Sequence, residues 1–197
     1  MKKAIFTVLI AAIITAVIYA VPVNGETELY NKVVRLHVIA NSDSEEDQTL
    51  KLAVRDAILE KVSSAAEGCQ SREEAEGVIA EMLPDIVKEA EKTLLENGCS
   101  YHVSAVIGKE NYPTREYGDV RLPAGNYTSL RVMIGEANGK NWWCVLFPPL
   151  CTGTAKADDT LVAAGFTPGE VRILTDSESP EYTLKFRILE IIGTLFS

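Results

Sequence analysis

The stretch RLHVIANSDSEEDQTLKLAVRDAIL, residues Arg35–Leu59, decides the fold prediction because its periodicity changes across four small polar residues. Before this joint, Val33–Ala40 alternates between two faces, as expected of a strand covered on one side. One face carries Val34, Leu36, Val38 and Ala40, and the other carries Val33, Arg35, His37 and Ile39. After the joint, Asn41–Ser44, apolar residues recur at helical spacing to about Ala66. The sequence therefore predicts a strand, a sharp joint and a long helix.

The joint itself could be a catalytic loop, an anion cradle or a helix cap. Ser42 has no Gly-x-Ser-x-Gly context, which argues against a nucleophile elbow. The joint lacks glycine and is followed by acids, so it would repel the phosphate that a helix start otherwise binds. Two capping pairs are present, Ser44 with Asp47 and Asp43 with Glu46. We therefore interpret the joint as a helix cap.

A second helical segment follows, with apolar residues at a period of about 3.6. It should begin at Ser71, whose capping partner Glu74 lies three residues on, and end at Asn97-Gly98. Pro84 predicts a kink near its middle. Because two helices in series each reverse the chain, the strand at 33–40 and the next strand should run antiparallel.

From residue 101 onward the pattern changes to period 2, which is typical of strands. Strand-like runs cover residues 101–107, 112–117, 128–134 and 142–147. Asn138-Gly139 predicts a hairpin turn between the last two runs. The predicted fold of residues 26–151 is an α+β domain. It is a mostly antiparallel sheet with a two-helix crossover, its second helix kinked, packed on one face.

The two ends of the chain lie outside this predicted domain. Residues 152–197 are predicted to be a polar connector followed by a C-terminal amphipathic helix that begins at Ser179-Pro180. Residues 1–25 hold two lysines and then the apolar run Ala4–Val21, the pattern of a signal peptide. The run also approaches the length that spans a bilayer, so an uncleaved anchor stays open. In both cases we expect the body to be exported.

Composition and residue types exclude several classes of function. The net charge of −9 argues against a nucleic-acid partner. The cysteines lack the spacing of a zinc site, and we expect no metal, no cofactor and no small-molecule substrate. The two histidines, His37 and His102, could be neighbours if their strands pair, which would allow a secreted hydrolase. Nothing else of a catalytic triad is present, so we favour no catalytic residues and regard the hydrolase as the alternative.

A recognition surface is the other function that the residues suggest. The polar row Gln48, Lys51 and Arg55 recurs along one flank of the first helix, beside Arg35 and His37 of the strand. These five residues, together with Trp142 and Trp143, are the predicted partner-binding residues. The alternative for the helix flank is an ordinary solvated face.

The four cysteines allow one disulfide to be excluded and leave another open. Cys69 and Cys99 are separated by roughly 26 helical residues, or roughly 40 Å, which is too far for a bond. Cys144 and Cys151 lie on either side of Pro148-Pro149, where the chain could turn back. An exported protein permits that bond, and the alternative is a buried free thiol at Cys144.

Three separated segments carry a family resemblance over nearly the whole predicted domain. They are RLHVIANSDSEEDQTLKLAVRDA at 35–57, LPAGNY at 122–127 and NWWCVLFPPLC at 141–151. Together they resemble the stage II sporulation protein R family. No family motif is matched between residues 152 and 179.

The resemblance implies a signalling protein of endospore-forming bacteria that is made in the forespore and secreted across its membrane into the intermembrane space. There it would activate the membrane-embedded aspartic protease of the stage II sporulation protein GA type, which matures pro-sigma-E. Composition and periodicity indicate only an acidic, exported α+β domain. A passive structural protein of the spore envelope is a third hypothesis.

Overall fold

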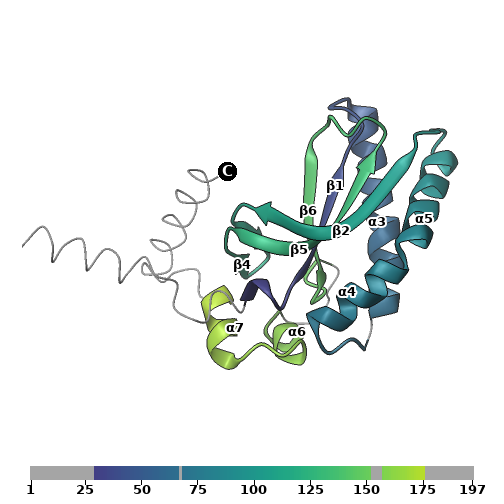
Figure 1. Ribbon diagram of the computed structural model, residues 1–197. Helices are drawn as coiled ribbons and strands as arrows, with labels where there is room; N and C mark the ends of the chain where they lie inside the picture. Colours follow the sequence, from purple (N-terminus) through teal and green to yellow (C-terminus); the bar gives the residue numbers. More distant parts are fainter. Residues whose placement is uncertain (1–28, 67, 152–156, 176–197) are drawn as a thin grey trace, which may run out of the picture.

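The computed structural model describes residues 29–66, 68–151 and 157–175 (Figure 1). The predicted signal peptide or anchor at 1–25 and the predicted terminal helix from Ser179 lie outside these residues. Among the described residues, no helix is both long enough and apolar enough to cross a bilayer.

A four-stranded sheet in the order β2-β5-β1-β6 forms the centre of the fold. Its strands are β1 (Val34–Ile39), β2 (Val103–Tyr112), β5 (Gly125–Ile134) and β6 (Asn141–Phe147). β5 pairs antiparallel with β2, while β1 pairs parallel with β5 and antiparallel with β6. The predicted antiparallel direction of β1 and β2 is therefore confirmed, but β5 lies between them.

Three helices cover one face of this sheet (Figure 1). They are α3 (Glu45–Ala66), α4 (Arg72–Glu81) and α5 (Leu83–Glu96). The predicted second helix is divided at Met82, beside Pro84, and Gly98 adopts a positive φ of 77° just after its end. The core between sheet and helices includes Leu36, Val38, Val54, Ile58, Ile79, Ile86, Ala90, Leu94, Leu130 and Val132.

The connection between β5 and β6 is not the predicted hairpin turn. The two strands flank β1 instead of pairing with each other. The connection passes the end of β1, where Gly139 N–H donates to Ala40 O at 2.9 Å and Asn138 N–H donates to Asn41 O at 3.1 Å. The amides of Asn138-Gly139 thus bind the first joint of the chain, which an isolated two-residue turn would not do.

Two smaller groups of elements complete the described part of the fold. β3 (Arg115–Tyr117) and β4 (Val120–Leu122) form a two-stranded antiparallel sheet. The segment predicted as a polar connector contains two helices, α6 (Ala157–Ala163) and α7 (Pro168–Thr175). Leu161, Phe166 and Leu174 from this segment are buried in the core, so the description as a polar connector is wrong for 157–175.

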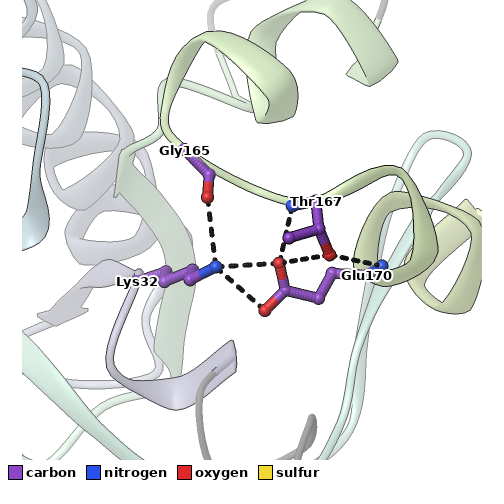
Figure 2. A network of polar contacts seen from close by, with 4 residues as sticks. All are labelled: Lys32, Gly165, Thr167 and Glu170. Carbon is purple, nitrogen blue, oxygen red and sulfur yellow. Dashed lines mark hydrogen bonds and ion pairs between the residues drawn. The ribbon is translucent and has the colours of Figure 1, made fainter.

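A partly buried ion pair fastens α7 to the chain just before β1 (Figure 2). Lys32 Nζ lies 2.8 and 2.9 Å from the two carboxylate oxygens of Glu170 and donates to Gly165 O at 3.1 Å. Thr167 caps α7, because its N–H donates to Glu170 Oε2 at 2.6 Å and its Oγ1 accepts the Glu170 N–H at 3.3 Å. Burial raises the pKa of Glu170, but the bonds from Lys32 and Thr167 outweigh it and leave that pKa below its usual value.

Candidate functional site

The joint at Asn41–Ser44 is built around the carboxylate of Asp47. Ser44 is the helix cap, since its Oγ accepts the Asp47 N–H at 3.1 Å. Ser42 Oγ and Asn41 Nδ2 donate to Asp47 Oδ2 at 2.5 and 2.8 Å. The bond from Ser42, aided by that from Asn41, lowers the pKa of Asp47 in spite of its burial. The joint is therefore a capped turn, as its sequence predicts.

The same joint also clamps the connection that leads into β6. Asn41 Oδ1 accepts the Glu136 N–H at 3.0 Å, and Asp43 Oδ1 accepts the Lys140 N–H at 2.7 Å. Asp43 is therefore bound to this connection rather than serving as the cap. These hydrogen bonds tie the first strand-to-helix joint to the segment that leads into β6.

The structure corrects the predicted exposure of Lys51. This residue is only 4% exposed. Its Nζ donates to Gln48 Oε1 at 2.5 Å and to Lys140 O at 3.0 Å, and burial lowers its pKa. Gln48 is half-buried and donates from Nε2 to Ser42 O at 2.8 Å. Both side chains therefore support the joint, and the polar row of the helix flank is not a solvated face at these positions.

Arg35 is likewise buried instead of displayed, with no exposed surface. Its guanidinium carbon lies 3.9 Å from the ring centre of Tyr112, 4.8 Å from that of Tyr127 and 5.5 Å from that of Tyr117. The hydroxyl of Tyr117, on β3, accepts a hydrogen bond from Arg35 Nη2. The prediction that only one face of β1 is covered is wrong here, because β3 and the tyrosines cover the second face.

His37 lies on the same face as Arg35 and is 4% exposed, which again corrects the prediction of a displayed side chain. Its Nδ1 and Nε2 lie 2.9 Å from Glu110 Oε1 and 2.9 Å from Asn141 Oδ1. Its ring stacks on Trp143 at a centroid distance of 3.8 Å. Burial raises the pKa of Glu110, and the bond from His37 more than offsets this and lowers it. Sequence reasoning missed Glu110, because the predicted strand stopped at residue 107.

The two histidines are not brought together. The side chain of His102 is 83% exposed and pairs with Glu91 of α5 at 2.8 Å, on the helix-covered side of the sheet. His37 faces the opposite side, and β5 lies between β1, which carries His37, and β2, which His102 precedes. The His37–His102 pair on which the hydrolase hypothesis depends is therefore not assembled.

The other predicted residues, Arg55, Trp142 and Trp143, meet at an open groove beside β6. Trp142 is 37% exposed, and the guanidinium of Arg55 lies 4.3 Å from its ring centre. The β6-edge groove has a volume of about 530 Å³. It is lined by Arg55, Asp56, Leu59, Glu60, Tyr117, Gly118, Trp142, Trp143, Cys144, Leu150 and Cys151. This groove, rather than the flank of α3 alone, is the candidate site.

A disulfide forms part of the lining of the groove. Cys144 and Cys151 are joined in the structure, with their Cα atoms 6.3 Å apart. The chain turns between them at Pro148-Pro149, and Val145 N–H donates to Cys151 Sγ at 3.2 Å. Cys69 and Cys99 are free thiols. Within 29–66, 68–151 and 157–175 no cluster of three or more His, Cys, Asp and Glu side chains could hold a metal ion.

Comparison with known proteins identifies the family of this fold. The sequence model of stage II sporulation protein R matches residues 30–157, which include β1 to β6 and the whole β6-edge groove. The chain belongs to the stage II sporulation protein R family. It is also 39% identical over 128 residues to stage II sporulation protein R of Bacillus subtilis (strain 168). That match covers 65% of this chain and 57% of the relative, so the chain spans little more than half of the relative's length. No solved structure matches the chain.

Proposed function

We propose that this protein is an exported signal of endospore formation that activates the membrane-embedded aspartic protease of the stage II sporulation protein GA type. That protease would then mature pro-sigma-E. The family match over residues 30–157 carries the proposal, because it assigns the chain to sporulation. A ligand of this kind needs a partner-binding surface and no catalytic centre of its own.

The geometry of the predicted catalytic pair supports a ligand more than a hydrolase. His37 is held by Glu110 and Asn141 and stacked on Trp143, so both of its ring nitrogens face protein groups. A general base needs a nitrogen within reach of the substrate proton. The open groove carries no histidine.

The proposed location follows from the expected export. We propose secretion across the forespore membrane into the space that faces the mother cell, with the segment 1–25 either removed or kept as an anchor. Amino-terminal sequencing of the exported protein should find a start at Val21 or Glu26. A start at Met1 would show that the segment is retained as an anchor.

Activation can be tested by adding the purified exported chain, residues 26–197, to membranes that carry the protease and pro-sigma-E. Cleavage should depend on both the added chain and the protease. Membranes without the protease are the control. Equal cleavage with and without the added chain would contradict the proposal.

The same assay separates the ligand from the hydrolase hypothesis. His102→Gln should activate within severalfold of the parent, because this exposed side chain does not line the groove and precedes β2, at the edge of the sheet opposite β6. Loss of a catalytic base typically costs about 10² to 10⁴ in rate. A loss of that size with unchanged stability would favour the hydrolase.

A further inference from the structure

We propose that the β6-edge groove binds an extended segment of the partner as an added strand beside β6, with a basic side chain of that segment facing Asp56 and Glu60. The identity of the partner as the protease rests on the proposed function. The strand-addition mode itself rests on the edge, the groove and its charge.

Among the described residues, β6 has one edge that no other strand pairs with. It is the last strand in the order β2-β5-β1-β6, so β1 occupies only one of its edges. Val145 N–H points away from β1, because it donates to Cys151 Sγ at 3.2 Å. Hydrogen-bonding direction alternates along an antiparallel strand, so the N–H and C=O of Trp143 also point to the outer edge. The edge therefore presents the donor and acceptor pattern that β-augmentation uses.

The groove has the shape that an added strand needs. The groove is lined by Asp56, Leu59 and Glu60 of α3, and also by Tyr117 of β3 and Gly118 of the β3–β4 turn. The Val145 N–H is already bonded to Cys151 Sγ, so the accessible edge runs from Asn141 to Cys144 and holds an extended segment of about four residues, roughly 13 Å long. Apolar side chains at both ends would meet the partly exposed Trp142 ring and Leu150.

Charge decides which kind of segment fits. The guanidinium of Arg55 is already engaged, because it lies over Trp142 and its Nη2 is 2.7 Å from Asp56 Oδ1. The Asp56 side chain is 64% exposed and Glu60 is also exposed, whereas the Arg55 side chain is only 17% exposed. The α3 wall thus carries one cation and two carboxylates, with the carboxylates toward solvent. A lysine or arginine on the partner would complement it, and the net charge of −9 would attract a basic segment.

A second copy of this chain fits the groove less well than a basic segment. Two copies that pair β6 with β6 would form a symmetric interface, in which each surface meets its own equivalent. The acidic walls with Asp56 and Glu60 would then be brought toward each other. Like charges placed together across an interface weaken binding.

The first test removes one backbone donor from the edge. Trp143→Pro deletes the N–H that points into the groove, and Trp143→Ala deletes the same side chain but keeps that N–H. Each variant of the 26–197 chain is titrated on membranes carrying the protease and pro-sigma-E. Cosedimentation with these membranes measures binding separately from cleavage. We expect Trp143→Pro to need about tenfold more protein than Trp143→Ala for half-maximal binding and cleavage.

A second pair keeps the proposal testable if Trp143→Pro does not fold. Glu60→Lys reverses a charge in the groove, and Glu81→Lys makes the same change at an exposed site on α4. We expect Glu60→Lys to weaken binding at least about threefold, less so at high salt, and Glu81→Lys to behave as the parent. If the two variants of each pair fold and do not differ in binding or cleavage, the strand-addition proposal is overturned.

The remaining outcomes separate this proposal from the proposed function. If the parent binds the membranes without causing cleavage, and Glu60→Lys abolishes that binding, the groove proposal is supported and activation is refuted. Cleavage that is insensitive to all groove variants would keep activation and refute the groove. A parent dimer in sedimentation equilibrium that Trp143→Pro dissociates would assign the edge to a second copy and overturn the partner segment.

Discussion

Gly139→Ala tests whether the joint and the start of β6 form one unit. A Cβ at Gly139 would lie 2.2 Å from Ser42 O and 2.6 Å from Ser42 C, both backbone atoms, and 2.9 Å from Ala40 Cβ. Real Cβ contacts are essentially never shorter than 3.0 Å. The connection must therefore move away from the joint by about 0.8 Å, the difference between 3.0 and 2.2 Å.

This movement acts on three hydrogen bonds at once. Gly139 N–H to Ala40 O measures 2.9 Å, Asn138 N–H to Asn41 O measures 3.1 Å, and Lys140 N–H to Asp43 Oδ1 measures 2.7 Å. At about 1 kcal/mol each, their loss costs about 3 kcal/mol of the free energy of unfolding. Alanine restricts the unfolded chain and returns about 0.4–1 kcal/mol. The expected net loss is about 2–3 kcal/mol.

Urea denaturation of Gly139→Ala against Gly108→Ala gives the measurement. A Cβ at Gly108, in β2, meets no atom within 4 Å, so this control should be neutral or slightly more stable than the parent. A loss of about 2–3 kcal/mol corresponds to a melting point lower by roughly 4–12 °C in a chain of this size. If the two variants differ by less than about 0.5 kcal/mol, the clamp between joint and β6 does not hold.

Three further predictions concern charge and disulfide state. The pKa of Asp47 is lowered in the fold, so its carboxylate stabilises the protein above the unfolded value of about 3.9, and this stability is lost as the pH falls through the folded pKa. In urea titrations below about pH 5, Asp47→Asn should therefore lose less stability than the parent, and parallel curves would refute the role of this carboxylate. Lys51→Glu should lower the free energy of unfolding by about 3 kcal/mol or more, because it places a carboxylate against two oxygen acceptors. Arg55→Glu should lower it by about 1 kcal/mol or less. Similar losses for the two variants in urea denaturation would show that Lys51 is not buried in solution. Mass mapping of non-reduced peptides should find Cys144 linked to Cys151, and alkylated thiols at both positions would contradict the link.

The helical half of the fold could be predicted because its signals are local. Ser44 and Ser71 cap the helices at which their sequence spacing placed them, and Gly98 ends the last of the three. The same local rule would have found α7, since Thr167-x-x-Glu170 with Pro168 between them is a capping box.

The strand order could not be predicted in the same way. An Asn-Gly pair between two strand-like runs has the same appearance whether the strands form a hairpin or flank a third strand. β1 lies between β5 and β6 through parallel and antiparallel pairing across at least 90 residues of chain, and no local pattern encodes that choice. The sequence around Asn138-Gly139 is compatible with a hairpin and with a connection past the end of β1, and the structure contains the second.

The alternation along β1 led to a wrong prediction of exposed side chains, because alternation indicates which residues are polar and not which are exposed. Arg35 is buried by tyrosines that follow it by 77 or more residues, so its environment is set by tertiary contacts. Of the predicted recognition surface, Arg55, Trp142 and Trp143 line the β6-edge groove, while Arg35, His37 and Lys51 are buried. Whether a polar residue on a predicted open face is exposed depends on long-range contacts, which the local sequence pattern does not give.

The two adjacent tryptophans show why the edge of β6 is a better candidate than either face of the sheet. Consecutive side chains on a strand point to opposite faces. Trp142 accordingly lies under Arg55 on the α3 side, whereas Trp143 stacks on His37 on the other side. A ligand on one face could contact only one of the two rings. A strand added along the outer edge of β6 would lie between both, and it would meet the backbone of Trp143 at the same time.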